Sequence, residues 1–258
     1  MNKKHYLLYL ALPTLLLLQN CIKEKDNVIP GVTKVTEHWG YEHAESWGGI
    51  SGNCAGVIQS PIDINTSGTA KDTDLPSLQF SYSSFPISII DNGHTIQVNT
   101  NTYSAANTVS YKDKTYQLKQ FHFHAMSEHT INGEHSPMEL HLVHAADDGA
   151  LLVVGLMIKE GTANSMIDRV WNSIPDMENK EEQRTITINV KDLLPAMQGY
   201  YSYIGSLTTP PCAMGLSWFV MKEPLFLSSA QIAAFRQLYD HNYRPVQPLN
   251  NRTVHEKP

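Results

Sequence analysis

Two histidines separated by one phenylalanine, His122 and His124, are the feature that most limits how this chain can fold. On a β-strand, side chains two positions apart share a face, so both imidazoles would point one way while Phe123 points into a core. His141 follows in an alternating polar and apolar run, which predicts a second strand beside the first. Three neutral imidazoles from neighbouring strands can hold a catalytic zinc ion and leave one coordination position open. The sequence thus predicts a zinc site on two β-strands.

A structural role for these histidines is the alternative. The chain contains 12 histidines, and a single histidine in a strand is more often a hydrogen-bonded structural residue than a ligand. The H-x-H spacing and the nearby third histidine favour a metal. Glu128 and Glu139 lie close in sequence and could orient ring N–H groups as hydrogen-bond acceptors.

Short alternating segments separated by turn residues predict a protein that is mainly β (α+β). Strands are expected at residues 78–82, 87–91, 95–99, 108–111, 115–123, 140–146 and 151–159. Helices are expected at 164–174 and after Ser228, which has the spacing of a capping box, while 46–56 and 242–254 are expected to be irregular. The 258 residues suit a single domain, and a net charge of -6 without a basic block indicates that the chain does not bind nucleic acid.

The first 36 residues have a different composition. Lys3 and Lys4 precede a short apolar run, which predicts an export signal over 1–20. Cys21 follows in a context similar to a bacterial lipobox, although Gln19 and Asn20 depart from its small residues. Lipidation of Cys21 would make 21–36 a tether and 37–258 the catalytic domain, and place the protein in the periplasm or cell envelope as a membrane-anchored lipoprotein. Simple secretion after cleavage at an unmarked site is the alternative.

The cysteine count agrees with export. If Cys21 carries a lipid, Cys54 and Cys212 remain, and two thiols in an oxidising compartment are typical of a disulfide. Two independent buried thiols are the other interpretation.

Several sequence blocks, in order along the chain, resemble the α-class carbonic anhydrases. They are Gln59–Asp63, Asn92–His94, Gln120–His124, Ser127–Thr130, Met138–His144, Gly205–Pro211 and Asn242–Arg252. The resemblance covers nearly the whole chain after residue 38. It implies a single domain with a large, mostly antiparallel twisted sheet and short peripheral helices. It also implies a Zn²⁺-dependent lyase that hydrates carbon dioxide reversibly to bicarbonate and a proton.

The resemblance assigns the catalytic roles. His122, His124 and His141 match the zinc ligands, and a zinc-bound hydroxide would attack carbon dioxide. Thr208 matches the threonine that aims the hydroxide by accepting a hydrogen bond from it. The hydroxyl of this threonine in turn donates a hydrogen bond to a glutamate, here Glu128. His94 matches the proton shuttle, for which an imidazole is suited near neutral pH. The alternatives are a surface turn at Glu128 and an ordinary turn histidine at position 94.

The remaining matched positions line or support the site. The substrate-binding wall would comprise Val143, Val153, Leu207, Thr208, Thr209 and Trp218. Polar supporting positions would be Tyr41, Asn92, Gln120, Glu139 and Asn242. Cys54 and Cys212 match the disulfide of bacterial members. The pair Ala125-Met126 departs from the bulkier or proline-containing pair often found there, so the shape of the cavity or the rate could differ.

Two other functions are alternatives to carbon dioxide hydration. A carbonic-anhydrase-like binding module would lack zinc ligands, whereas this chain retains all three. A zinc esterase of broader specificity would hydrolyse esters faster than it hydrates carbon dioxide, and the small apolar wall argues against it. The expected partners are carbon dioxide and bicarbonate and, through the lipid anchor, a membrane. A homodimer is left open.

Overall fold

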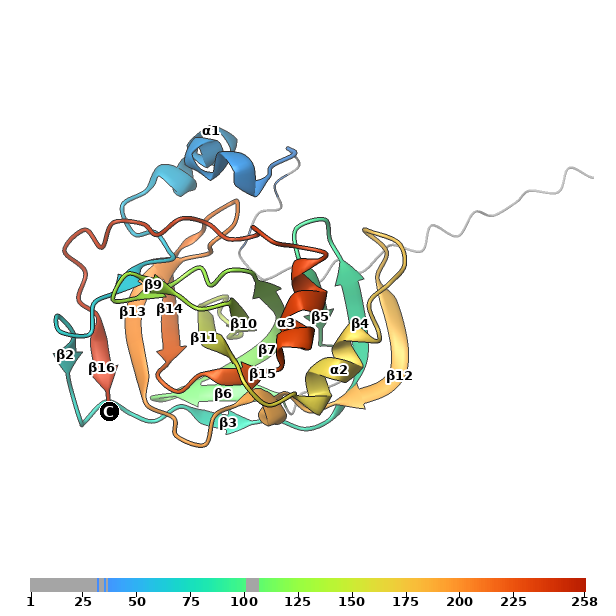
Figure 1. Cartoon of the computed structure of the whole chain (residues 1–258). Helices are drawn as coiled ribbons and strands as arrows, with labels where there is room; N and C mark the ends of the chain where they lie inside the picture. Colours follow the sequence, from blue (N-terminus) through green and yellow to red (C-terminus); the bar gives the residue numbers. More distant parts are fainter. Residues whose placement is uncertain (1–31, 33–34, 36, 101–106) are drawn as a thin grey trace, which may run out of the picture.

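One mixed sheet of thirteen strands dominates the residues that the structure, a computed structural model, describes (Figure 1). These residues are 32, 35, 37–100 and 107–258. The predicted export signal, Cys21 and most of the predicted tether lie outside them. Val32 is half-buried and packs against part of the core of the domain.

The sheet has a continuous path of ten strands. In spatial order they are β12 (Glu182–Ile188), β4 (Phe85–Asp91), β5 (Ile96–Asn99), β7 (Lys114–His124), β10 (Met138–Ala145), β11 (Leu151–Glu160), β14 (Met214–Met221), β13 (Tyr200–Ser206), β16 (His255–Lys257) and β2 (Ala70–Lys71). Beside this path, β15 (Leu225–Leu227) pairs with β11, and β3 (Gln79–Ser81) pairs with β6 (Thr108–Tyr111), which pairs with β7. A separate small sheet contains β1 (Asp63–Ile64), β8 (Thr130–Ile131) and β9 (Glu134–His135).

Hydrophobic pattern explains the position of the central strands. Every residue of β10 is buried, as are the first eight of β11, because both strands have neighbours on each side and packed layers on both faces. Most strand pairs are antiparallel, but β11 runs parallel to β14 and β15. The predicted fold class, a large and mostly antiparallel twisted sheet, is confirmed.

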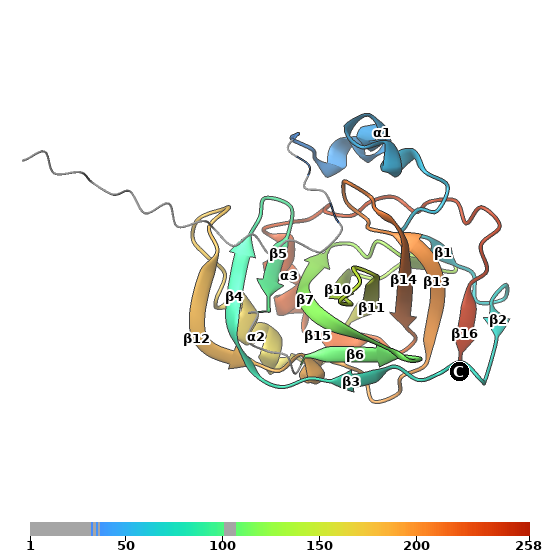
Figure 2. The same cartoon turned by 180° about the vertical axis from the view of Figure 1, so that it is seen from behind.

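Two helices cover one face of the sheet. These are α2 (Ser165–Trp171), capped by the side chain of Asn164, and α3 (Ser229–Arg236), which begins with a capping box between Ser228 and Gln231. Figures 1 and 2 show α2 and α3 side by side next to β4 and β5. Both helices pack against the Phe123 side of β7. The side chains of His122 and His124 lie on the opposite face of that strand.

Short helical turns replace part of the loop expected at 46–56. They are η1 (Tyr41–Ser46), α1 (Trp47–Ile50) and η2 (Gly52–Ala55), and a further turn, η3 (Val190–Leu193), lies before β13. The prediction for 46–56 was wrong in part because a four-residue turn is too short to produce a hydrophobic period. Strands β12, β13 and β14 had not been predicted. In both views α1 lies at the end of the molecule opposite β3 and β6.

Candidate metal centre

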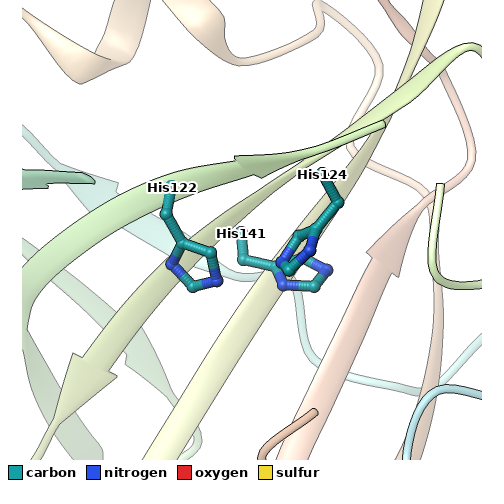
Figure 3. Close-up of side chains that lie close together, drawn as sticks. All are labelled: His122, His124 and His141. Atoms are coloured by element: carbon teal, nitrogen blue, oxygen red, sulfur yellow. The ribbon is translucent and has the colours of Figure 1, made fainter. Parts of the chain in front are cut away.

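The three predicted ligands meet on one face of the sheet. His141 on β10 is directly opposite His122 on β7 in the strand register, and His124 lies two residues further along β7. Figure 3 shows the three rings converging from these two strands. One nitrogen from each ring lies within 4.8 Å of the other two. His124 and His141 are buried and His122 is half-buried.

The other nitrogen of each ring faces an oxygen acceptor. Nδ1 of His122 lies 2.8 Å from Oε1 of Gln120, and Nδ1 of His124 lies 2.6 Å from the backbone oxygen of Asn242. Nε2 of His141 lies 2.9 Å from Oε1 of Glu139. A backbone carbonyl and a carboxylate can only accept, so each ring donates on this side and presents a lone pair on the other.

Three lone pairs directed at one another need a cation between them. Nε2 of His124 is buried without a hydrogen-bond partner among the described residues, although it lies 3.4 Å from Oε2 of Glu128. Burial lowers the pKa of His124 to about 3 and, with the neighbouring histidines, that of His122 well below its usual value. The rings are therefore neutral at pH 7. A neutral three-nitrogen set matches the ligands of a catalytic zinc site.

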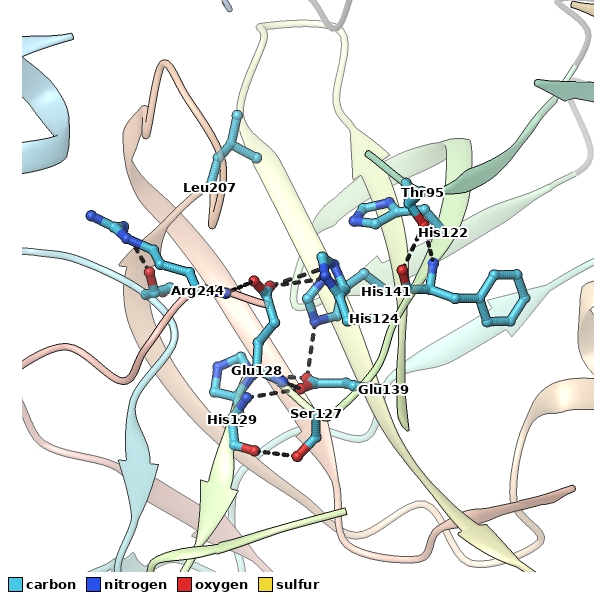
Figure 4. A network of polar contacts seen from close by, with 12 residues as sticks. Thr95, His122, His124, Ser127, Glu128, His129, Glu139, His141, Leu207 and Arg244 are labelled. Atoms are coloured by element: carbon cyan, nitrogen blue, oxygen red, sulfur yellow. Dashed lines mark hydrogen bonds and ion pairs between the residues drawn. The ribbon is translucent and has the colours of Figure 1, made fainter. Parts of the chain in front are cut away.

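Glu128 lies beside the ligands and is fully buried (Figure 4). Its Oε1 accepts a hydrogen bond from the backbone N–H of Arg244 at 2.8 Å, and its Oε2 is 3.8 Å from Nδ1 of His141. Burial raises the pKa of this carboxyl well above its usual value, while the Thr208 hydroxyl and the Arg244 N–H act in the opposite direction. Glu128 and Thr208 are thus brought together from distant parts of the chain.

Glu139 is the centre of a network that the sequence did not predict. Its Oε2 accepts hydrogen bonds from the backbone N–H groups of Glu128 at 2.9 Å and His129 at 2.8 Å. Its Oε1 lies 2.8 Å from Nδ1 of His129, whose Nε2 is 2.6 Å from the hydroxyl of Tyr203. Burial raises the pKa of Glu139, but the neighbouring His129 and His141 lower it by more. The net result is a pKa well below the usual range.

Asn242 joins the ligand strand to the turn that carries His94. Its backbone oxygen faces His124, while its Nδ2 donates to the backbone oxygens of Phe123 at 2.9 Å and His94 at 3.0 Å. Its Oδ1 accepts from the N–H of Ala125 at 2.8 Å. Because Asn242 is buried, these contacts fix the His94 turn against the end of β7.

His94 follows β4 in a tight turn. Oδ1 of Asn92 accepts from the N–H groups of His94 at 3.0 Å and Thr95 at 2.9 Å. The His94 ring is stacked on Trp39, with centroids 3.7 Å apart and planes inclined by 8°. Trp39 also contacts the ring of Tyr41 edge-on at 5.6 Å.

Apolar side chains form a wall behind the histidines. Val153 on β11 pairs with Val143 on β10 and with Trp218 on β14, and these three buried residues belong to one core cluster. Leu207 is half-buried and packs on the same cluster. Thr208 is buried and Thr209 is half-buried in the loop after β13.

Cys54 and Cys212 form a disulfide, as predicted, with their Cα atoms 4.9 Å apart. It ties η2 to the loop that follows Thr209. Arg244, for which no role was predicted, braces the same region. Its guanidinium donates to the backbone oxygens of Cys54 at 3.0 Å and Ser60 at 2.9 Å and to Oε1 of Gln59 at 2.7 Å.

Comparisons with known proteins agree with this geometry. A family model for eukaryotic-type carbonic anhydrase matches residues 42–258. A carbonic anhydrase from Klebsiella pneumoniae is 42% identical over 87% of this chain and 93% of its own length, and human carbonic anhydrase 7 is 34% identical over 84% and 96%. The α-carbonic anhydrase from Thermovibrio ammonificans, solved with the inhibitor sulfanilamide, superposes with a TM-score of 0.80 at 42% identity, covering 84% of this chain and 98% of that one.

Proposed function

This chain belongs to the eukaryotic-type carbonic anhydrase family, and from that premise we propose which of its residues carry out each part of the reaction. It is a zinc-dependent enzyme that interconverts carbon dioxide and water with bicarbonate and a proton. The observation that carries the assignment of the site is the convergence of three neutral imidazoles, each with its second nitrogen facing an acceptor.

His122, His124 and His141 would hold the zinc ion. Zinc held there supplies a Lewis acid that makes a water nucleophilic near neutral pH, an effect for which carbonic anhydrase is itself the standard example. Neutral ligands suit this chemistry because they leave the charge of the ion uncancelled. Gln120, Glu139 and the carbonyl of Asn242 would orient the three rings.

Thr208 would aim the reacting water. Burial opposes ionisation of Glu128, whereas the Thr208 hydroxyl and the Arg244 N–H favour it, and once ionised this carboxylate can only accept hydrogen bonds. The hydroxyl of Thr208 would then donate to Glu128 and keep its oxygen free to accept the proton of the water. This arrangement directs a lone pair of the water toward the carbon of carbon dioxide.

The apolar wall would bind carbon dioxide. The substrate is small and uncharged, so a surface without charged groups suits it, and Val143, Val153, Leu207 and Trp218 supply one. The half-buried hydroxyl of Thr209 would contact bicarbonate as it forms.

His94 would carry the proton from the site to solvent, with Tyr41 and Asn92 as polar neighbours in the cavity. It is half-buried, and burial and the neighbouring His38 lower its pKa from the usual value. The His94→Ala variant should turn over more slowly at low buffer concentration, and added imidazole should restore part of the rate. His255→Ala, which removes an exposed histidine on β16, is the control. A His94→Ala enzyme with the wild-type rate would remove the shuttle role.

The export of the chain is part of the same proposal. The disulfide is consistent with an exported protein, and among the described residues no helix is long and apolar enough to cross a membrane. We infer lipidation of Cys21, a signal over 1–20 and a tether over 21–36, which would anchor the domain 37–258 in the periplasm or cell envelope. Mass spectrometry of the membrane fraction tests this, and an unmodified N-terminus downstream of Cys21 would contradict it. The homodimer belongs with these hypotheses and is tested by light scattering.

A further inference from the structure

The segment before β12 lies against the turn that carries His94. The backbone N–H of Asn179 donates to the backbone oxygen of Asp91, the last residue of β4, at 2.6 Å. The side-chain amide of Asn179 donates to Oε1 of Glu178 at 3.0 Å. One hydrogen bond therefore links Asn179 to the turn, and a second links Asn179 to the exposed carboxylate of Glu178.

Glu178 contacts the residue next to His94. A methyl group placed on Gly93 would lie 2.6 Å from Oε1 of Glu178, so the carboxylate fills the space that a side chain at position 93 would occupy. Gly93 also has φ +78°, a conformation that favours glycine. A glycine at this position thus lets an anionic group approach the His94 turn.

Other charged groups surround the same turn. Asp91 accepts hydrogen bonds from the N–H of Gly93 and from the hydroxyl of Tyr239, so its carboxylate is already engaged. Glu42 lies over Gly40 and His38 precedes Trp39, and both side chains are exposed. Lys180 is 3.1 Å from Glu182, and no ion pair neutralises Glu178 among the described residues.

The environment of His94 combines opposing effects on its protonation. Burial and His38 lower its pKa, whereas Glu178 and Glu42 raise it. The indole of Trp39 covers one face of the imidazole, and an aromatic face attracts a cation. Of these two carboxylates, Glu178 accepts a hydrogen bond from the side-chain amide of Asn179 in its own loop, so its effect on His94 should be the more constant.

We propose that Glu178 is a positioning residue for proton release, which holds a negative charge beside the His94 turn and stabilises the protonated imidazole as it passes the proton to solvent. The inference rests on the shuttle role proposed for His94. It adds a residue from the segment between α2 and β12, which contributes nothing to the metal centre itself.

The direct test is the titration of the His94 ring by NMR in the zinc-loaded protein. Three variants are compared with the wild type: Glu178→Gln, Glu178→Lys and, as control, Glu134→Gln. Glu134 is exposed on β9, so its substitution changes the net charge equally without touching the turn. Removing the charge of Glu178 should lower the pKa of His94 by roughly 0.3–0.5 unit, as expected for one charge whose interaction with the imidazole is partly screened by solvent. Reversing the charge should about double that shift.

Salt separates an electrostatic role from a structural one. The difference between wild type and Glu178→Gln should shrink as ionic strength rises, because exposed charges are screened. The pH profile of maximal turnover should move to lower pH in Glu178→Gln and stay unchanged in Glu134→Gln.

Failure of this inference is distinct from failure of the shuttle. A His94 pKa that is unchanged in both Glu178 variants would overturn the role of Glu178, while leaving the effect of His94→Ala as it is. An equal shift in Glu134→Gln would also overturn it, since net charge alone would then explain the result. If His94→Ala retains full turnover, the shuttle fails, whatever the NMR titration gives.

Discussion

Glu139 and His129 form a buried pair directly behind the metal centre, with Oε1 of Glu139 2.8 Å from Nδ1 of His129. The same oxygen lies 2.9 Å from Nε2 of the ligand His141. The second oxygen of Glu139 accepts the N–H groups of Glu128 and His129, which fixes the strand-to-loop segment that carries Glu128. One carboxylate would therefore orient a metal ligand and support the residue proposed to act through Thr208.

Substitution of this carboxylate should weaken metal binding. In Glu139→Gln an amide replaces an acceptor-only group, so His141 loses its charged partner, and zinc affinity should fall about 10–100-fold. Chelator competition measures the affinity, and Glu134→Gln serves as the control because Glu134 is exposed on β9. Unchanged zinc affinity in Glu139→Gln would show that His141 does not depend on Glu139.

The ligand set was predictable from the sequence, whereas its support was predictable only in part. The alternation around Phe123 places His122 and His124 on one strand face because a strand has a period of two. The contact of Glu139 with His141 was expected from the family resemblance. The roles of His129 and Arg244 were not, because their partners lie far away in sequence and only the fold brings them together.

Strands β13 and β14 were not predicted because their sequences do not show the alternation expected of a strand. β14 is mostly buried at its C-terminal end, with Trp218 to Met221 all apolar, so it has little alternation to mark it as a strand. Its neighbour β13 is rich in tyrosine and ends in the Gly205–Pro211 block, which was interpreted as a functional motif. Seven strands and two helices were predicted with ends shifted by a few residues, which is the expected uncertainty of a sequence pattern.

Loss of the disulfide should destabilise the domain under oxidising conditions. Cys54 and Cys212 are 158 residues apart, and a cross-link over so long a loop reduces the entropy of the unfolded chain. Cys54→Ser should lower the free energy of unfolding by on the order of 4 kcal/mol, measured by urea denaturation. With reducing agent present, wild type and variant should have the same stability. A persistent difference there would assign the effect to packing.

A buried histidine away from the metal should contribute to acid sensitivity. His144 lies on β10 with Nε2 2.8 Å from the hydroxyl of Tyr82, and burial lowers its pKa to about 3. An exposed histidine has a pKa of about 6.5, so between these two pKa values the unfolded chain binds one proton more than the folded chain. The stability contributed by neutral His144 is therefore present above pH ~6.5 and lost as the pH falls toward 3.

Replacing this histidine should flatten the dependence of stability on pH. His144→Gln keeps a polar side chain that does not titrate, so the slope should decrease by up to about 1.4 kcal/mol per pH unit between pH ~6 and ~4. Denaturant unfolding at a series of pH values measures the slope. His255→Gln, an exposed histidine on β16, should leave it unchanged. Parallel curves for His144→Gln and wild type would contradict a neutral buried imidazole.

Titration of the metal-free protein with zinc, followed by carbon dioxide hydration, tests the three-histidine centre most directly. The site contains one group of converging imidazoles, at His122, His124 and His141, whose second nitrogens all face acceptors. Hydration activity should therefore rise with added zinc and reach a plateau at about one equivalent per chain, as expected for a three-nitrogen catalytic site. His141→Ala should show little activity over the same range. Full hydration activity without zinc, or in His141→Ala, would contradict this site.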